Sequence, residues 1–538
     1  MADTLLAFDG LRIESMASAA ARPLVDAITL TLDRGEVLGL IGESGAGKST
    51  LGLAALGYRR PGCAVTAGRV VFDGQDLGRL SAAELRAVRG SRVAYVAQSA
   101  AASFNPAKRL GDQVAETLML HRAADGASAR RRAADLFAEL DLPSPQTFGA
   151  RYPHQVSGGQ LQRAMIAMAM ACEPELLILD EPTTALDVTT QIEVLAAIRK
   201  MLRRHGAAGL YITHDLAVVA QLADRLAVLR HGRLVETGPT ATILQAPTDE
   251  YTRRLVAIRA EPDRIEEAPA DAAPVLAARN VSASYRTMAN VLSDVSFTLQ
   301  AGETLAVVGM SGSGKSTLAR VLCGLMPPQN GSVAFHGEAL PADFRRRSRE
   351  QLRRVQMIYQ LPDTALNPRH TVGRIVGRVI EFYFGLRETA QRTRVDELLD
   401  RVGLPRDFTR RRPGELSGGQ KQRVCIARAL AAEPDLVICD EVTSALDPLV
   451  ADEILTLLEQ LQERTRTAYI FITHDIGVVR RVADHVAVME KGRIVAFGPL
   501  REVFAAPLHP YTQLLLSSVP QMRTDWLTDI LSAREDAA

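Results

Sequence analysis

Hydrophobic and polar residues follow the same succession twice along the chain. Residues 37–41 and 304–308 are short apolar runs that predict buried strands, and each leads into a glycine-rich segment and then a helical pattern. Residues 176–181 and 436–441 form a second pair of apolar runs, which end in Asp-Glu. This alternation of strands with helices predicts a mostly parallel α/β core in each half.

The segments between these runs have a different pattern. Residues 110–142 and 372–404 lack the alternation of strands and are rich in Ala, Leu, Arg and Glu. They predict a helical subdomain inserted into each core.

Four motifs recur in the same order in both halves. G-E-S-G-A-G-K-S-T at 42–50 recurs as G-M-S-G-S-G-K-S-T at 309–317, and V-S-G-G-Q at Val156 recurs as L-S-G-G-Q at Leu416. The Asp-Glu runs and an I-T-H-D sequence complete the series. The period is far above the roughly 20 to 50 residues of solenoid repeats, so it indicates a duplicated domain.

The duplication sets the expected domain boundaries. Residues 261–274, E-P-D-R-I-E-E-A-P-A-D-A-A-P, are rich in Pro, Ala and acidic side chains, which is typical of an extended linker. We therefore expect domain one at 1–260, domain two at 275–522 and a C-terminal tail at 523–538. The tail has no counterpart in the first half.

Composition restricts the classes of function. Of 538 residues, 47% are hydrophobic and 23% are charged, which is typical of a globular protein. The 63 basic residues balance 62 acidic ones, so bulk charge does not recruit nucleic acid. The five cysteines lack C-x-x-C or Cys/His spacing, and we expect them to be reduced in a cytosol.

The N-terminal residues and the apolar runs indicate whether the chain has a signal peptide or a membrane-spanning segment. The first 15 residues lack the basic start of a signal peptide, and no uncharged apolar run approaches the roughly 20 residues that span a bilayer. We expect the chain to be soluble, or to associate with a membrane only through partners.

The nine-residue motif carries the clearest chemistry. In G-x-x-x-x-G-K-[ST] after a strand, backbone N–H groups wrap phosphates, the lysine reaches the β and γ oxygens, and the next hydroxyl ligates Mg²⁺. A lone match could be a glycine-rich turn with a surface lysine, but two matches with the same downstream partners argue against that alternative. The candidate phosphate-binding residues are Gly42, Glu43, Ser44, Gly45, Ala46, Gly47, Lys48, Ser49 and Thr50, and Gly309, Met310, Ser311, Gly312, Ser313, Gly314, Lys315, Ser316 and Thr317.

Two acidic residues follow at each second strand. Asp180 and Asp440 are expected at the C-terminal edge of the sheet, where open α/β folds bind ligands, and are candidates to hold the metal through water. Glu181 and Glu441 are next in the chain and are placed to polarise water for in-line attack. An exposed acidic turn is the alternative, and it fits poorly after such apolar runs.

A histidine follows a further apolar run in each half. His214 and His474 each lie 34 residues after the aspartate of their own half. At a strand end, each is able to donate a hydrogen bond to a γ-phosphate. A structural histidine is the alternative, and the identical spacing favours a functional one.

The S-G-G-Q motif precedes a long apolar run that predicts a helix. Its serine is placed as an N-cap, with free amides beside the helix dipole, which makes an anion site without a catalytic group. An ordinary capped helix is an equal alternative on the pattern alone. The motif residues are Ser157, Gly158, Gly159 and Gln160, and Ser417, Gly418, Gly419 and Gln420.

Together these motifs resemble the ABC ATPase family over nearly the whole chain. They match its Walker A loop, its Q-loop at Gln98 and Gln360, its signature, its Walker B strand and glutamate, its D-loop at 185–187 and 445–447, and its switch histidine. The resemblance implies two tandem P-loop NTPase domains, each with a RecA-like parallel core, an antiparallel β subdomain and a helical insert.

The same resemblance implies an ATPase that uses ATP and Mg²⁺. It assigns catalytic roles to Glu181, Glu441, His214, His474, Gln98 and Gln360, and metal ligation to Ser49, Ser316, Asp180, Asp440, Gln98 and Gln360. In the family, cassettes pack head to tail, so each phosphate loop is expected to face the S-G-G-Q motif of the other half. Both halves keep the glutamate and the histidine, so both sites are expected to hydrolyse ATP.

A subfamily is also indicated. S-F-N-P at 103–106 and A-L-N-P at 365–368 resemble the S-L-N-P element of oligopeptide and dipeptide importer ATPases. H-P-Y-T at 509–512 is similar to that group's ending, and E-Y-T at 250–252 is a degraded version of it. Fusion of both ATPases in one chain resembles the glutathione and microcin or peptide importer members.

This resemblance implies the energy-coupling subunit of a bacterial peptide-class importer, peripheral on the cytoplasmic face of the inner membrane. Its partners would be two integral-membrane permeases and, indirectly, a periplasmic solute-binding protein, with no nucleic acid. The cargo, whether peptide, glutathione, nickel or antibiotic peptide, is not decided by the ATPase sequence.

Two departures from the family pattern change the picture. Tyr285 matches the aromatic residue that stacks on adenine, but the aligned residue in half one is Ser15. A lost stacking face is worth about 1 kcal/mol, so adenine is expected to bind less firmly in the first half. No cysteine follows Cys439, so the iron–sulfur cluster of some relatives is not expected.

A soluble tandem ABC protein that acts on ribosomes is the alternative, because it would share every phosphate motif. Such proteins usually have a long charged helical linker, whereas the linker here is short and rich in proline. The basic residues 345–347 suggest RNA less than they suggest a solvated helix face.

Overall fold

The computed structural model describes residues 3–16, 23–184, 186–258, 274–285, 288–444 and 446–536. The predicted linker lies outside this part of the chain, except for Pro274. Two compact units are present, one formed by Met1–Arg259 with Pro520–Ala538 and the other by Ala260–Val519. Residues 520–522, which were predicted to close domain two, group with the tail in the first unit.

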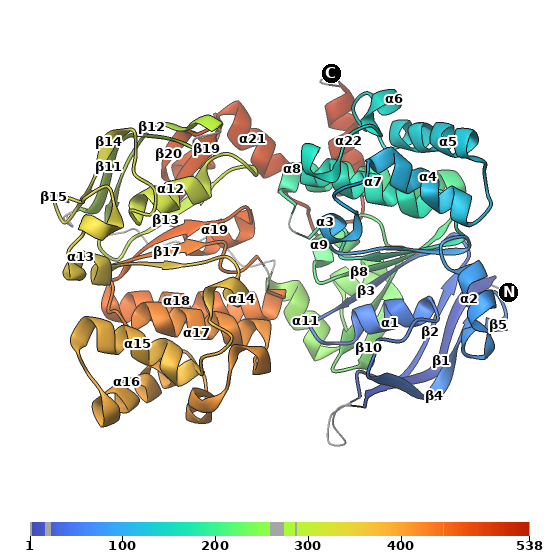
Figure 1. Cartoon of the computed structure of the whole chain (residues 1–538), viewed down its shortest axis with the longest axis horizontal. Coiled ribbons are helices and arrows are strands. Elements are labelled where there is room, and N and C mark those ends of the chain that lie inside the picture. The colour runs from blue at the N-terminus through green and yellow to red at the C-terminus, as the bar shows by residue number, and fades with distance from the viewer. Residues whose placement is uncertain are drawn as a thin grey trace. The chain divides into compact units, whose positions relative to one another are not determined.

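The first unit contains two sheets (Figure 1). Its strands are β1 (Thr4–Ser15), β2 (Val25–Asp33), β3 (Val37–Gly42), β4 (Cys63–Phe72), β5 (Gln75–Asp76), β6 (Val93–Val96), β7 (Leu176–Asp180), β8 (Ala208–Thr213), β9 (Arg225–Arg230) and β10 (Arg233–Pro239). The larger sheet has the order β10-β9-β3-β8-β7-β6 and is parallel apart from β10. All residues of β3, β7 and β8 are buried, as parallel strands require. The smaller sheet, β2-β1-β4-β5, is antiparallel.

The helices of this unit connect the strands and form the insert. They are α1 (Lys48–Ala55), α2 (Ala82–Val88), α3 (Ala100–Ser103), α4 (Leu110–Leu120), α5 (Gly126–Glu139), α6 (Pro145–Phe148), α7 (Gly158–Met170), α8 (Val188–His205), α9 (Leu216–Val219), α10 (Thr240–Gln245), α11 (Glu250–Ala257) and α22 (Trp526–Asp536). Helices α4 and α5 form the insert predicted at 110–142. Asp125 caps α5 by accepting the N–H of Ser128 at 2.8 Å, and Leu118 and Leu136 are buried in the insert.

The second unit repeats the two sheets. Its strands are β11 (Pro274–Tyr285), β12 (Met288–Gln300), β13 (Thr304–Val308), β14 (Asn330–Phe335), β15 (Glu338–Ala339), β16 (Val355–Ile358), β17 (Leu436–Asp440), β18 (Ala468–Ile472), β19 (His485–Glu490) and β20 (Arg493–Pro499). The sheet orders are β16-β17-β18-β13-β19-β20 and β12-β11-β14-β15. The predicted parallel core and the implied antiparallel subdomain are thereby confirmed in both units.

The helices of the second unit follow the same plan. They are α12 (Lys315–Leu322), α13 (Arg349–Arg354), α14 (Pro362–Ala365), α15 (Val372–Phe384), α16 (Glu388–Arg401), α17 (Gly418–Leu430), α18 (Pro448–Thr465), α19 (Ile476–Val482), α20 (Leu500–Val503) and α21 (Pro510–Ser517). Helices α15 and α16 form the insert predicted at 372–404. Thr371 caps α15, and Gly385 ends it in the left-handed conformation at φ 70°.

Membrane-spanning helices were sought in the part of the chain that the structure describes. No helix there combines the length and the apolar character needed to cross a membrane.

Candidate nucleotide sites

The phosphate loop begins where the central strand of each large sheet ends. Gly47 and Gly314 precede α1 and α12 with φ 95° and 106°, a conformation that favours glycine. A Cβ atom on Gly47 would lie 2.4 Å from the carbonyl oxygen of Leu24, and one on Gly42 would lie 2.2 Å from that of Leu229. Gly42 and Gly47 are therefore required by the close approach of neighbouring backbone.

The loop lysines are buried within their own loops. Lys48 Nζ donates to the carbonyl oxygens of Gly42 at 2.6 Å and Glu43 at 2.9 Å. Lys315 Nζ makes the same bonds to Gly309 at 2.7 Å and Met310 at 2.9 Å. Each ammonium group is therefore held at the first turn of the loop, where a strand edge and a helix N-terminus meet.

The predicted metal ligands are brought together in pairs. Ser49 Oγ donates to Asp180 Oδ1 at 3.1 Å, and Ser316 Oγ donates to Asp440 Oδ1 at 3.3 Å. Among the described residues, no group of three or more His, Cys, Asp or Glu side chains could hold a metal ion by itself. One carboxylate and one hydroxyl suit Mg²⁺, which usually completes its shell with phosphate oxygens and water.

The predicted glutamate, histidine and glutamine of each half meet in one cluster. Glu181 accepts from Gln98 Nε2 at 2.9 Å and lies 3.2 Å from His214 Nδ1. In the second unit, Gln360 Nε2 donates to Glu441 at 2.5 Å, and His474 Nδ1 lies 3.5 Å from that carboxylate. The glutamine amides thus reach the glutamates, and neither Gln98 nor Gln360 forms a hydrogen bond with the Ser–Asp pair of its unit.

Both glutamates have a strained backbone. Glu181 and Glu441 have φ 50°, the left-handed region that side chains other than glycine rarely adopt. Each N–H donates at 2.8 Å to the carbonyl of a residue in the neighbouring strand, Ile212 or Ile472. Such strain costs on the order of 1 kcal/mol and is concentrated at functional sites. It is tolerated there because it directs a side chain where a regular backbone conformation would not place it.

The charges of the cluster favour an ionised glutamate. Burial alone would raise the pKa of Glu181, but hydrogen bonding to His214 and the charges of His214 and Lys48 outweigh it and lower that pKa. The pKa of Glu441 is lowered for the same reasons by His474 and Lys315. Burial would lower the pKa of His474, yet its bond to Glu441 and the negative charge there raise it. An ionised carboxylate is the form that can accept a proton from water.

The signature serines cap helices as predicted. Ser157 Oγ accepts the N–H of Gln160 at 3.3 Å, and the Gln160 side chain accepts the N–H of Ser157 at 3.2 Å. Ser417 and Gln420 form the same capping box. The motif glutamine is therefore committed to the helix start, a role that the pattern alone did not indicate.

The second glycine of each signature has a packing role. A Cβ on Gly159 would lie 2.1 Å from Thr190 Cγ2, and one on Gly419 would lie 2.4 Å from Val450 Cγ1. Helices α7 and α17 can approach α8 and α18 closely only because this residue has no side chain. Its conservation between the two halves thus has a structural cause beside any contact with an anion.

Comparisons with known proteins agree with this geometry. A family model described as ABC transporter matches residues 25–184 and 292–444. The chain belongs to the ABC transporter family. It is accordingly an ATP-binding protein and an ATPase. A second model, described as Oligopeptide/dipeptide transporter, C-terminal region, matches residues 495–537.

Relatives of this ABC protein match nearly its whole length. The glutathione import ATP-binding protein GsiA of Escherichia coli (strain K12) is 38% identical over 96% of this chain and 90% of its own. That of Pectobacterium atrosepticum is 39% identical over 92% of this chain and 86% of its own. Among solved structures, cbiO1 from Clostridium perfringens is 32% identical over 43% of this chain and 91% of its own, with a TM-score of 0.39. The cassette MJ0796 bound to ADP and Pi is 30% identical over 42% and 99%, with a TM-score of 0.38.

The two ABC cassettes differ at the candidate adenine-stacking position. The pairing of Leu6 with Phe72 and of Leu276 with Phe335 aligns β1 with β11, and this register places Ser15 at the position of Tyr285. The Tyr285 hydroxyl lies 3.4 Å from Thr317 Oγ1 and accepts from Arg320 at 2.9 Å, so the ring is held beside the helix that the phosphate loop starts.

Two tyrosines of the sites were missed by the sequence analysis. Tyr251 Oη accepts the backbone N–H of Glu43 at 3.0 Å, and Tyr511 Oη accepts that of Met310 at 2.8 Å. Both rings are buried, and both hydroxyls reach the second residue of a phosphate loop. The available signal was the Tyr-Thr pair at 251–252 and 511–512, which recurs with the spacing of the other late motifs.

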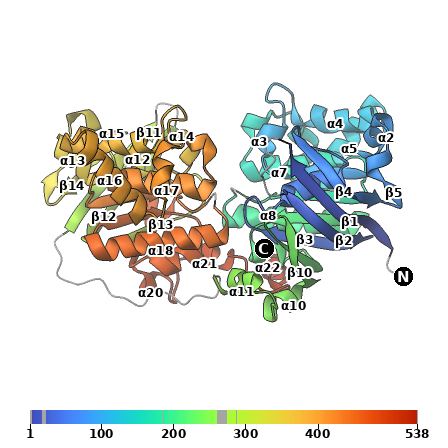
Figure 2. The same ribbon diagram turned by 90° about the horizontal axis from the view of Figure 1, so that it is seen from below.

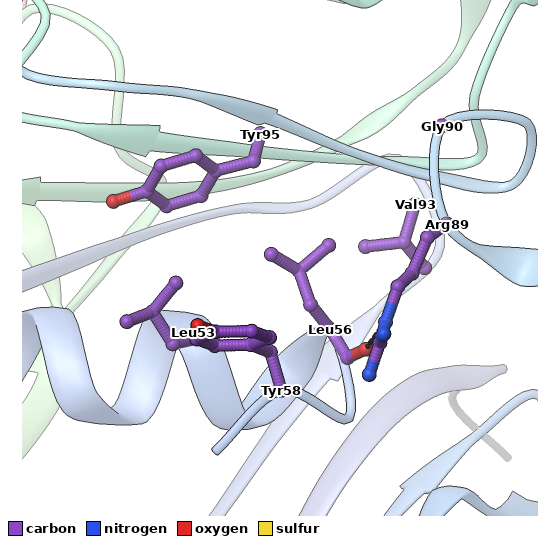
Figure 3. A pocket seen from close by; sticks show the side chains of 7 residues that line it. All are labelled: Leu53, Leu56, Tyr58, Arg89, Gly90, Val93 and Tyr95. Carbon is purple, nitrogen blue, oxygen red and sulfur yellow. Dashed lines mark hydrogen bonds between the residues drawn. The ribbon is translucent and has the colours of Figure 1, made fainter. Parts of the chain in front are cut away.

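An open pocket of about 360 Å³ adjoins the first site (Figure 3). Its lining residues are Leu53, Leu56, Tyr58, Arg89, Gly90, Val93 and Tyr95. Tyr95 comes from β6 and donates its hydroxyl to Asp180 Oδ2 at 2.6 Å, so one side chain joins the pocket to the candidate metal pair. Burial and this bond raise the pKa of Tyr95. The D-loop residues Ala185 and Ala445 lie outside the described residues.

Proposed function

We propose that the chain is the ATP-hydrolysing, energy-coupling subunit of a bacterial importer for peptides or peptide-like solutes such as glutathione. The observation that carries this proposal is the 38% identity to a glutathione import ATP-binding protein over 96% of the chain. The C-terminal match to oligopeptide and dipeptide transporters supports the same class of solute. A protein that acts on ribosomes is not favoured by these relatives.

Each site is proposed to work through the residues that the fold brings together. The loop N–H groups and Lys48 or Lys315 bind the phosphates, and Ser49 with Asp180, or Ser316 with Asp440, would hold Mg²⁺. That ion would neutralise charge on the transferred phosphoryl group. Gln98 and Gln360 are proposed to ligate the same Mg²⁺ ion in addition to their catalytic role.

The chemical step is assigned to the glutamate clusters. Glu181 and Glu441, held ionised by the neighbouring histidines, orient the attacking water and accept its proton. His214 and His474 donate to the γ-phosphate. Closure on ATP and reopening after hydrolysis would then move the permeases.

The permeases are proposed to dock at equivalent apolar surfaces of the two cassettes. Tyr58 and Leu120 are 43% and 74% exposed in the first unit, and Leu325 and Phe382 are 46% and 51% exposed in the second. Leu120 is the last residue of α4, and His121 follows it. A Cβ atom on Gly90, which lines the pocket of Figure 3, would lie 2.6 Å from the His121 ring, so the end of α4 lies beside this pocket. Exposed apolar residues that recur at the same place in both halves indicate a partner surface.

Purification of the chain from its native membrane after mild detergent extraction tests the proposal. Two integral-membrane proteins should accompany it, and a periplasmic solute-binding protein should stimulate ATP hydrolysis of the assembly when glutathione or a peptide is present. Recovery of ribosomes in place of membrane proteins would overturn the proposal.

A variant of the docking surface sharpens this test. Leu325→Glu with Phe382→Glu changes the surface of the second cassette and should reduce recovery of the membrane partners while the isolated chain keeps its ATP hydrolysis. The matched control is Leu514→Glu, which changes a residue of similar exposure on α21 and should leave the recovery intact. Equal recovery with both variants would exclude this surface.

A further inference from the structure

We infer that residues 520–536 are a docking segment, which returns from the second cassette and binds the first cassette at Gln221 and Arg199, a site called the seat below. Charge excludes the segment from the equivalent place on the second cassette. The chain passes from the first unit to the second and back, so this segment is a second connection between them beside the linker. The inference goes beyond the transport function and does not depend on the solute.

A buried amide forms the centre of the seat. The Gln221 side chain is 4% exposed, and its Nε2 donates at 2.9 Å to the carbonyl oxygens of both Gln521 and Arg523. Its Oε1 accepts the N–H of Leu527 at 3.0 Å. One side chain thus satisfies three backbone groups of the segment, including an N–H in the first turn of α22 that has no partner within the helix.

Apolar burial accompanies these hydrogen bonds. Trp526 and Leu527 at the start of α22 are 3% and 0% exposed. Arg199 on α8 donates to Thr528 Oγ1 at 2.9 Å, and α22 lies beside α8 in both Figure 1 and Figure 2. A tryptophan buried to this degree is typical of a specific packing contact and not of a loose terminus.

The second cassette differs at the positions of the seat. Arg199 and Gln221, which contact the segment, correspond to Glu459 and Arg481. Their neighbours in the chain and on α8, Ile192, Ala196 and Ala220, correspond to Asp452, Thr456 and Arg480. Arg481 forms ion pairs with Asp452 and, at 3.1 Å, with Glu459, and it donates to Thr456 at 2.6 Å. Arg480 is exposed there, whereas Ala220 is 2% exposed. The same face is therefore an ion-paired surface in one cassette and a covered seat in the other.

This difference explains why the segment binds the first cassette and not the second. Docking of Trp526 and Leu527 against the second cassette would bury the Arg481 ion pairs without replacing their water. Gln221 is neutral and offers both donors and an acceptor to the backbone, which arginine cannot do. The substitutions that distinguish the duplicated halves thus create a binding site for the end of the chain.

Gln221 also connects the docked segment to α9, which begins two residues after His214. Asp215 follows His214 and caps α9 by accepting the N–H groups of Ala217 and Val218. Gln221 Nε2 donates to the carbonyl oxygen of Ala217 at 2.8 Å, so this side chain joins α9 to the segment.

Cleavage of the full chain at a protease site inserted in the linker tests the inference. In buffer without nucleotide, the two pieces should stay together on size-exclusion chromatography, because the segment tethers the second piece to the first. Gln221→Arg, which introduces the residue of the second cassette, should weaken this association at least about tenfold. Separation of the cleaved wild-type pieces, or association that Gln221→Arg does not weaken, would overturn the inference.

Two further variants keep the result interpretable. Trp526→Ser with Leu527→Asp changes only the segment, so it should release the pieces even where Gln221→Arg fails to fold. The reciprocal control Arg481→Gln should leave the association unchanged. Hydrogen exchange in the uncleaved protein should show the backbone amide of residue 527 protected in the wild type and exchanging rapidly in both the Gln221→Arg variant and the segment variant. Equal protection in all three proteins would contradict the docking contact.

Discussion

The hydroxyl of Tyr511 accepts the backbone N–H of Met310 at 2.8 Å, and so ties α21 to the first turn of the phosphate loop in the same cassette. Tyr251 makes the equivalent bond to Glu43 at 3.0 Å. Because Lys48 and Lys315 donate to the carbonyl oxygens of Gly42 and Gly309, which share peptide units with these two N–H groups, each of these peptide units is held from both sides. Motifs near the cassette ends, far from the loop in sequence, thus position it.

Removal of the Tyr511 hydroxyl should weaken nucleotide binding at the second site. Tyr511→Phe keeps the ring but leaves the Met310 N–H without its acceptor, at a cost of about 1 to 3 kcal/mol in loop stability. We expect ATP affinity at that site, measured by titration with a fluorescent analogue, to fall, and Tyr251→Phe should act alike at the first site. Unchanged affinity in both variants would show that the bond does not position the loop.

Substitution of Glu181 should separate binding from hydrolysis. Glu181→Gln removes the proton acceptor but keeps the size and the hydrogen-bonding capacity of the side chain. ATP turnover at that site should therefore fall by roughly 10²-fold to 10⁴-fold. ATP affinity should persist. Glu116→Gln on α4 is the control, and an unchanged single-site turnover in Glu181→Gln would exclude the catalytic role.

Exchange of the residues at the adenine end should alter the affinities of the two sites in opposite directions. Ser15→Tyr adds a ring face to the first site, and Tyr285→Ser removes one from the second, each by about 1 kcal/mol or about fivefold in affinity. The second cassette holds its tyrosine with Arg320, where the first has Leu53, so Ser15→Tyr with Leu53→Arg should bind more tightly than Ser15→Tyr alone. Calorimetric titration of each variant with ATP measures this. Affinity that does not respond to Tyr285→Ser would remove the stacking role.

The stability of the second cassette should depend on pH through His485. Its bond to Glu303, which outweighs the effect of burial, raises the pKa of His485 above its unfolded value of about 6.5. The ion pair therefore stabilises the fold fully below about pH 6.5, and this contribution is lost as the pH rises through the raised pKa. The urea midpoint of the second unit should fall across that window.

The first cassette supplies the control for this pH dependence. Arg225 occupies the position of His485 and donates to Glu36 at 2.8 Å, and arginine stays charged throughout this range. His485→Arg should therefore remove the decrease in stability at higher pH. A decrease of equal size in His485→Arg would assign it to other groups.

Much of the site was predictable because its residues occur in short local motifs. Lys48 and Ser49 follow a glycine-rich turn at a strand end, and Asp180 and Glu181 end a buried strand, so their types and spacing determine where they lie once the sheet forms. The strained φ of Glu181, in contrast, depends on the carbonyl of Ile212 in a neighbouring strand. No local pattern records such a bond.

The sequence by itself determined the duplication, the parallel cores with their helical inserts, and the choice of candidate phosphate-binding residues, because each of these depends on periodicity or on a motif of a few adjacent residues. The tertiary structure decided that Tyr511 holds the loop at Met310, that Gly159 serves helix packing, and that the tail belongs with Gln221 of the first unit. These contacts join residues far apart in the chain, and only folding brings them together. Their energy comes from burial and satisfied hydrogen bonds, which a linear pattern does not contain.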